Sequence, residues 1–368
     1  MSDSTRKAQP DRIHFVTTGD PENWIITSGS GSATYTLPSQ YKVYLITGGT
    51  GSLGTALTKH LLAAGHKVRV YARNEHRHED LERQIPEEQR PRLSCLIGAV
   101  EDGPRLKRAM RGVDYVIHAA AMKVVPLCEY NPAQAVLTNV SGTSNVMEAC
   151  LDGSVKRCVL VSTDKARGPS TLYGATKLAA ERLWLASNLY RGGEGGVFSA
   201  VAYGNVFGSR GSVLHAFNQQ ASSGGLLQVT DPASTRFHIS LEQAVRFVLD
   251  AVDHAEPGTL WIPKLPSYRV GDFATAFSRV YGLTKEPVIT GLRPAEKRHE
   301  DLISENESYA VKGDSGCTPA SKDGLTGHYV LEPGKVHCQG GWSYNSGSNP
   351  WKLSIAELEK EIRAWARP

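Results

Sequence analysis

Long apolar runs are missing from this sequence. No segment approaches the roughly 18–20 consecutive apolar residues that a membrane-spanning helix needs. The first ten residues, MSDSTRKAQP, are polar and lack the apolar core of a secretory signal peptide. We therefore expect a protein that is neither embedded in a membrane nor secreted, and we predict a cytoplasmic location.

Charge of one sign and paired cysteines are also scarce. The 41 Lys and Arg residues against 37 Asp and Glu residues leave a net charge of only +4. So small and dispersed an excess does not favour nucleic acid as a partner. The six cysteines include no C-x-x-C pair, which favours reduced thiols over a metal or disulfide framework. His76 and His78 lie in a charged run without further ligands, so we expect no metal site.

Glycine, by contrast, is abundant, and its 36 residues suit a fold with many tight turns between strands and helices. From residue 42 onward, short apolar runs alternate with segments of helical periodicity. Near-continuous apolar strands that alternate with helices predict an α/β fold, namely a Rossmann-type doubly wound parallel sheet. The predicted strands are 43–46, 67–71, 93–97, 113–118, 155–162, 197–203 and 259–262, and the longer predicted helices are 132–150, 171–189, 242–252 and 355–366.

Composition and the alternation of predicted strands and helices also predict how the chain is divided into domains. The first part is rich in Ser, Thr and Gly and contains two alternating runs, 13–17 and 33–37. The regular alternation of strands and helices stops after Asn205, and the remainder predicts a smaller C-terminal lobe that binds substrate. The predicted parts are 1–40, a tail or small hairpin; 41–204, a nucleotide-binding Rossmann domain to which 238–262 return; and 205–237 with 263–368, the substrate-binding lobe.

A glycine-rich loop follows the first predicted strand of the Rossmann domain. Its glycines provide a tight turn, close approach of the backbone to a pyrophosphate, and close packing of helix on strand. The following helix directs free N–H groups and its positive dipole end at the phosphates. Small residues at the end of the fourth strand let a cofactor lie across the strand ends. The predicted contacts are Gly48, Thr50, Gly51, Ser52, Leu53, Gly54, Ala119, Ala120 and Ala121.

The residues after the second predicted strand of the Rossmann domain indicate whether the cofactor is NAD or NADP. An acidic residue there would bind the ribose diol of NAD, but the sequence has Arg73, with no acid directly beside it, followed by Asn74. Arginine suits a 2′-phosphate because its guanidinium forms forked hydrogen bonds. We therefore predict NADP rather than NAD, with Arg73 and Asn74 near the adenosine end.

A second segment predicts redox chemistry at a hydroxyl-bearing carbon. Thr163 follows the fifth strand of the Rossmann domain, at the sheet edge where ligands bind. Tyr173 and Lys177 are four residues apart and share one helical face. We expect Lys177 to lower the pKa of the Tyr173 phenol and to hold the nicotinamide ribose. A tyrosinate can then take a hydroxyl proton while hydride leaves the same carbon.

Asp164 and Lys165 add groups that a simple oxidoreductase does not need. Oxidation of a sugar C4 hydroxyl acidifies the hydrogen on C5, which a base can remove while an acid protonates the departing C6 hydroxyl. We assign Lys165 as the C5 base and Asp164 as the C6 acid, with the two able to exchange roles. A neutral Lys165 requires a pKa below the usual value of about 10.4, and we expect burial and Lys177 to lower it.

These residues together resemble the extended short-chain dehydrogenase/reductase family. Within it the sequence is similar to the soluble UDP-N-acetylglucosamine 4,6-dehydratases, chiefly the C5-inverting type of the pseudaminic acid pathway. The resemblance covers about residues 42–365. The segments that carry it are TGGTGSLG (47–54), HAAAMKVVPLCEYNP (118–132), STDKA (162–166), LYGATK (172–177), YGNVFGSRGSV (203–213), TDPASTRF (230–237), GLRPAEKRHEDLISENE (291–307) and YNSGSNP (344–350).

The resemblance implies roles for individual residues, as well as a homo-oligomer with a UDP-sugar substrate. It implies an active site of Thr163, Asp164, Lys165, Tyr173 and Lys177. It implies that Val100, Lys123, Tyr173 and Lys177 also contact the cofactor. The residues that it implies for the UDP-sugar are Lys123, Asn205, Arg210, Val213, Arg236, Arg293 and Glu296.

Two departures and three alternatives accompany the resemblance. Relatives carry an aspartate where this chain has Ala99, and SRD where it has ARN at 72–74. Membrane-bound relatives have a methionine at the position of Tyr173.

The alternatives are a C5-retaining dehydratase, a nucleotide-sugar epimerase and, outside catalysis, an NADP-sensing regulator. The intact Thr163, Tyr173 and Lys177 set disfavours the regulator, which has no need of it.

Overall fold

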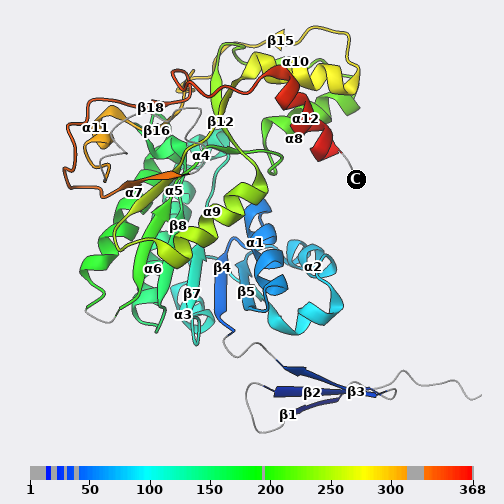
Figure 1. The fold of residues 1–368 in the computed structure, drawn as a ribbon, viewed down its shortest axis with the longest axis vertical. Helices are drawn as coiled ribbons and strands as arrows, with labels where there is room; N and C mark the ends of the chain where they lie inside the picture. Colours follow the sequence, from blue (N-terminus) through cyan, green and yellow to red (C-terminus); the bar gives the residue numbers. More distant parts are fainter. Residues whose placement is uncertain are drawn as a thin grey trace, which may run out of the picture.

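The computed structural model describes residues 14–17, 23–28, 31–36, 41–192, 195–312 and 327–366. Its centre is an eight-stranded sheet of order β17-β13-β9-β8-β7-β4-β5-β6 (Figure 1). All neighbouring pairs in it are parallel except β13 with β17. The strands are β4 Val43–Thr47, β5 Lys67–Ala72, β6 Leu93–Ile97, β7 Tyr115–His118, β8 Arg157–Val161, β9 Val197–Val201, β13 Leu260–Pro263 and β17 His328–Leu331.

The strand order reverses between β4 and β7, as expected for a doubly wound sheet, so the predicted Rossmann-type fold is confirmed. Helices cover both faces of the sheet. The helices α1 (Ser52–Ala63) and α9 (Leu241–His254) pack together on one face, while α3 (Gly103–Ala109), α6 (Gly142–Leu151) and α7 (Leu172–Ala186) pack on the other. The apolar strands are buried because both faces are covered.

The predicted helix over 132–150 is wrong in its continuity. It consists of α5 (Pro132–Val136), a π-helical turn over Leu137–Ser141 and α6. Asn139 in this turn is buried, and its side-chain amide bonds to both backbone groups of Met122 and to Thr176. The turn therefore ties the strand-end segment after β7 to the helix that carries Tyr173 and Lys177.

The N-terminal segment was predicted as a tail or a small hairpin. The structure has three antiparallel strands there, in the order β1 (His14–Thr17), β2 (Asn23–Ser28) and β3 (Gly31–Thr36). The two alternating runs of the sequence correspond to β1 and β3. The prediction missed β2, which lies between them in the sequence and in the sheet.

Most of the described chain after Asn205, apart from α9, β13 and β17, forms the smaller lobe on the carboxyl-end side of the sheet (Figure 1). Three helices, α8 (Val213–Ser222), α10 (Val270–Tyr281) and α12 (Ile355–Ala366), share an apolar cluster of its own. The segment 263–368 also contributes β17 to the edge of the main sheet. The shorter elements are α2 Glu75–Arg83, α4 Val125–Tyr130, β10 Asn205–Val206, β11 Gln228–Val229, β12 Thr235–Ile239, β14 Ser267–Arg269, β15 Val288–Ile289, β16 Asp301–Ile303, α11 Glu305–Ser308 and β18 Tyr344–Asn345.

Within the described ranges, no helix has the length and apolar character required to cross a membrane. The same residues contain no group of three or more His, Cys, Asp or Glu side chains arranged to hold a metal ion.

Candidate active site

The glycine-rich loop joins β4 to the N-terminus of α1. Gly48 has a left-handed backbone (φ 68°), and a Cβ there would meet the backbone of Ala119 and Ala120 at 2.8–2.9 Å. A Cβ on Gly54 would lie 2.4 Å from Cα of Gly49. These two positions require glycine because the helix, the loop and the strand ends pack backbone against backbone.

Gly51 differs from them, because a Cβ there would have only the carbonyl oxygen of Gly48, at 3.1 Å, within 4 Å. The space beside Gly51 therefore opens at the start of α1, where N–H groups point outward. A pyrophosphate fits this arrangement, since it needs close backbone approach and free N–H donors. Thr50 is buried, whereas Ser52 and Leu53 are partly exposed at the mouth of the loop.

The remaining predicted cofactor residues lie around the same strand ends. Ala119, Ala120 and Ala121 follow β7 and are partly exposed. Val100 follows β6 and packs against Gly142 of α6. Arg73 is exposed after β5, and the side chain of Asn74 caps α2 by accepting the N–H of Arg77 at 3.0 Å.

The predicted catalytic residues come together from β8, the turn after it and α7. Tyr173 is buried, and burial raises the pKa of its phenol to about 12, against the lowering effects of the Lys165 charge and a hydrogen bond with Thr163. Lys177 is also buried and donates to the carbonyl oxygen of Val161 at 2.8 Å. Burial lowers the pKa of Lys177 to about 8. The expected lowering of the Tyr173 pKa by Lys177 is therefore wrong for the protein alone, since burial dominates and Lys165 is the opposing cation.

Asp164 and Lys165 form a 3₁₀ turn directly after β8, with Thr163 as its cap. Oδ1 of Asp164 accepts from Lys165 Nζ at 3.1 Å and from Thr163 Oγ1 at 2.8 Å. Glu300 lies on the other side of the ammonium, with its Oε1 atom 3.3 Å from Lys165 Nζ. The Lys165 amine thus lies between two carboxylates.

This arrangement corrects the expected lowering of the Lys165 pKa. Burial does lower it, but the charges of Asp164 and Glu300 outweigh burial and raise the pKa of Lys165 above its ordinary value. Burial also raises the pKa of the Glu300 carboxyl, against the nearby cation. The resting site therefore contains a protonated Lys165, and the amine must lose a proton before it can act as a base.

Sequence reasoning missed Glu300 and a second buried group, Arg167. Arg167 pairs with Glu181 of α7 and with Glu307 of α11, so it clamps the catalytic turn to two helices. An isolated buried charge is costly, so a fully buried arginine requires such partners. Glu300 and Glu307 both lie in the segment 291–307 that carries the resemblance, but only the fold places them beside residues 164–167.

The residues predicted for the UDP-sugar form two groups. Arg236 pairs with Glu296 at 3.2 Å, and Glu296 also accepts the backbone N–H of Arg293, which is itself exposed. Arg236 further donates to the backbone carbonyls of Thr235 and Arg298. Arg236 is therefore already oriented, with Glu296 as its counter-ion.

The second group lies on β10 and the loop and helix that follow it, together with Lys123 from the segment after β7. The carbonyl oxygen of Arg210 accepts from Lys123 Nζ at 3.1 Å, and its N–H donates to Ser52 Oγ at 3.0 Å. This loop therefore joins the start of α1 to the segment after β7. Asn205 and Val213 line a narrow cavity beside the loop, and Oδ1 of Asn205 is buried without a partner.

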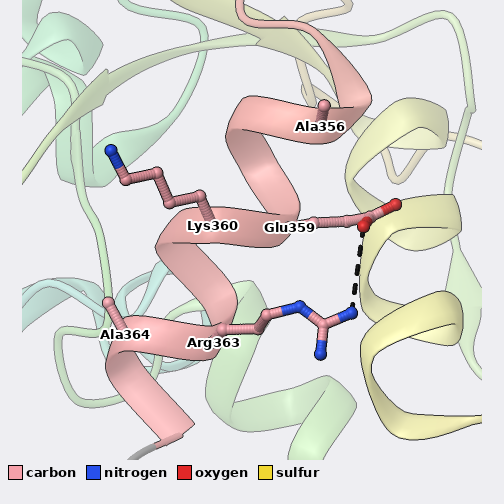
Figure 2. A pocket seen from close by; sticks show the side chains of 5 residues that line it. All are labelled: Ala356, Glu359, Lys360, Arg363 and Ala364. Carbon is pink, nitrogen blue, oxygen red and sulfur yellow. Dashed lines mark ion pairs between the residues drawn. The ribbon is translucent and has the colours of Figure 1, made fainter.

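Another hollow lies on the outer surface of α12, where Glu359 pairs with Arg363 at 3.9 Å (Figure 2). None of the residues predicted for catalysis or cofactor binding lines it, and its two basic side chains, Lys360 and Arg363, are exposed. We assign no function to it.

The sheet order, the glycine-rich loop after the first strand and the Tyr173–Lys177 helix define an extended short-chain dehydrogenase/reductase. Residues 44–316 match the family described as "Polysaccharide biosynthesis protein". The chain belongs to this family.

Individual relatives agree with that membership. The chain is 41% identical over 327 residues to a Campylobacter jejuni protein named "UDP-N-acetylglucosamine 4,6-dehydratase (inverting)", covering 86% of this chain and 96% of the relative. It is 37% identical over 271 residues to a Rickettsia conorii "UDP-glucose 4-epimerase", covering 72% and 79%. The crystal structure of Pen from Bacillus thuringiensis superposes with a TM-score of 0.80 at 33% identity, covering 88% of this chain and 99% of that one.

Proposed function

We propose that this protein is an NADP-dependent 4,6-dehydratase that converts UDP-N-acetylglucosamine to a UDP-4-keto-6-deoxy-N-acetylhexosamine with inversion at C5. The observation that carries the proposal is Lys165, held between Asp164 and Glu300 beside Tyr173. An acid–base group of this kind exceeds what oxidation alone requires. The long alignment with the inverting dehydratase of Campylobacter jejuni supports the same assignment.

Bound NADP would accept hydride from C4 of the sugar and later return it to C6. In the first step the phenolate form of Tyr173, hydrogen-bonded with Thr163, takes the proton of the C4 hydroxyl. Lys177, fixed by Val161, holds the nicotinamide ribose. Arg236 and Arg293 bind the diphosphate of the substrate, because guanidinium groups suit phosphate oxygens.

Elimination then uses the hydrogen bond between Lys165 and Asp164. Transfer of one proton from Nζ to Oδ1 produces a neutral amine and a protonated carboxyl together. The amine removes the C5 proton while the carboxyl protonates the C6 hydroxyl, which leaves as water. Return of a proton to the opposite face of C5 gives the inverted product.

The alternatives differ in what they need from this site. An epimerase is supported by the similarity to the Rickettsia conorii enzyme, but it moves hydride at C4 alone and requires no acid–base pair for C5 and C6. A C5-retaining dehydratase would use the same pair and return the proton to the original face. We further propose a cytoplasmic homo-oligomer that carries NADP through each turnover.

Incubation of the purified protein with UDP-N-acetylglucosamine and no added cofactor tests the reaction. A dehydratase gives a product lighter by one water, an epimerase gives an isobaric product, and a regulator gives none. In deuterium oxide we expect deuterium at C5 with altered configuration by NMR. Asp164→Asn and Lys165→Ala should still reduce bound cofactor but release product about 10²–10⁴ times more slowly. Full dehydration by both variants would remove the pair from the mechanism, and unaltered C5 configuration would indicate the retaining class.

A further inference from the structure

Glu300 is a buried carboxylate that the mechanism above leaves without a role. It immediately precedes β16 and is only 4% exposed. Its Oε1 atom lies 3.3 Å from Lys165 Nζ, while Oε2 is buried without a hydrogen-bond partner. A buried charged oxygen without a partner is costly, so its presence at the reacting pair calls for an explanation.

The backbone of Glu300 is fixed by the second lobe. Its N–H donates to Ser346 Oγ at 2.9 Å, and its carbonyl oxygen accepts the N–H of Ser346 at 2.8 Å. Ser346 is fully buried and bonds to Thr235 of β12, the neighbour of Arg236. The carboxylate is therefore aimed at Lys165 by a rigid frame rather than by a mobile loop.

The surroundings of Lys165 show what this charge does. The charged and titratable groups that face it are Asp164 from its own turn, Glu300, Arg236 from β12, Tyr173 from α7 and Tyr268 from β14. Arg236 opposes a positive Lys165, whereas Asp164 and Glu300 favour it. Glu300 is thus a second carboxylate, besides Asp164, whose charge keeps Lys165 protonated.

We propose that Glu300 is a positioning residue that holds Lys165 opposite Asp164 and sets the pH at which the Asp164–Lys165 pair loses its shared proton. The catalytic consequence rests on the proposed dehydratase function. The ion pair itself does not, because it is a property of the protein without substrate. Glu300 keeps the proton on the pair until substrate arrives, so that acid and base are generated together by one transfer.

The direct test is the titration of the Lys165 side chain, followed by NMR in protein with isotope-labelled lysine, with the signal assigned by its loss in Lys165→Ala. Glu300→Gln keeps the shape and removes the charge, so the midpoint of Lys165 should fall by about one to three pH units. Glu300→Asp keeps the charge but moves it away from Lys165 by the length of one methylene group. It should lower the titration midpoint of Lys165 less than Glu300→Gln does. The control is Glu305→Gln, an exposed carboxylate in the same segment, which should leave the midpoint unchanged.

An unchanged or raised Lys165 midpoint in Glu300→Gln overturns the proposal. If Glu300→Gln fails to fold, as judged by thermal unfolding, Glu300→Asp decides by the same measure. An unchanged midpoint in Glu300→Asp would then overturn the proposal too.

A second test, on activity rather than on the Lys165 titration, is the pH dependence of kcat with UDP-N-acetylglucosamine. We expect its alkaline limb to move to lower pH in Glu300→Gln, with reduction of bound cofactor preserved, because loss of a negative charge lets the pair release its proton earlier. A purely structural role would lower kcat at all pH values without moving the limb, and that result overturns the proposal. Absence of dehydrated product from the unmodified protein would instead refute the proposed function, and the NMR titration would still report on Glu300.

Discussion

The glycine-rich loop and the acid–base cluster occupy the same end of the sheet but are built in different ways. The loop, Thr47–Gly54, takes its shape from contacts among neighbouring residues and the adjoining strand ends. The cluster brings Asp164 and Lys165 from the turn after β8 together with Glu300 from the second lobe. We expect the first site to bind a pyrophosphate through a local conformation, and the second to control protons through a tertiary arrangement.

This difference determines what a substitution should do at each place. A change in the loop should alter packing and cofactor affinity, because the backbone itself is the proposed binding surface. A change in the cluster alters protonation and rate, because charges in a partly buried site act strongly on each other. The following predictions separate the two kinds of effect, beginning with the largest.

Tyr173→Phe should abolish the first step. The substitution removes the oxygen that accepts the C4 hydroxyl proton and preserves the ring that packs with Cys128 and Ala135. We expect turnover to fall about 10²–10⁴-fold, with bound cofactor remaining oxidised. The measurement is the absorbance of reduced nicotinamide after addition of substrate. Near-normal turnover would refute the assigned role of Tyr173.

Gly54→Ala and Gly51→Ala should have different effects: the first mainly on the unfolding free energy, the second mainly on the affinity for NADP. A methyl group at Gly54 would meet the backbone of Gly49, and overpacking of this kind costs about 1–3 kcal/mol. At Gly51 it would meet only the carbonyl oxygen of Gly48, at 3.1 Å, so we expect weaker NADP binding with a smaller loss of unfolding free energy. Denaturant unfolding of cofactor-free protein and calorimetry with NADP make the comparison. Equal loss of stability in both variants would contradict the distinction.

Arg73→Glu tests the preference for NADP. Arg73 is exposed after β5 with no acidic residue beside it in the sequence. A charge-assisted contact contributes about 1.5–3 kcal/mol, so we expect NADP affinity to fall roughly tenfold to a hundredfold while NAD affinity changes little. Calorimetry on cofactor-free protein measures both. Equal affinity of the unmodified protein for NADP and NAD would remove the preference.

His118 provides a pH-dependent test at the point where the strand order reverses. Its ring is fully buried between Thr47 and Thr143, and burial, reinforced by the Lys177 charge, lowers its pKa to about 3. Between the unfolded value of about 6.5 and this value, the unfolded chain binds a proton that the folded protein excludes. Stability due to His118 is therefore present above pH 6.5 and declines as the pH falls, by about 1.4 kcal/mol per pH unit at most.

His118→Gln should weaken this acid dependence, as measured by denaturant unfolding between pH 7 and pH 4. The substitution also changes a hydrogen bond, which shifts stability at every pH, so the slope of stability against pH is the informative quantity. An identical slope in both proteins would show that His118 does not titrate in this way.

Most of the fold was predictable because its strands and helices follow from patterns among residues that are close in the sequence. Alternating apolar runs and helical periodicity predicted each main-sheet strand from β4 to β13, and α12 was predicted with its observed bounds. The break in the helix over 132–150 was not predictable, because it accompanies contacts of Asn139 with Met122 and Thr176 from other elements. The antiparallel strand β17 was missed for a similar reason, since its partner β13 lies far away in the sequence.

The sequence by itself determined the glycine-rich loop and the presence of Thr163, Asp164, Lys165, Tyr173 and Lys177 at one sheet edge. Residue type and spacing suffice there, because a strand end, a turn and a helix start place those side chains locally. Only the tertiary structure decided the protonation state of Lys165 in that site. Two carboxylates around Lys165 raise its pKa where burial alone would lower it, and one of them comes from the second lobe. A pKa depends on the distances between charges in space, which sequence spacing does not contain.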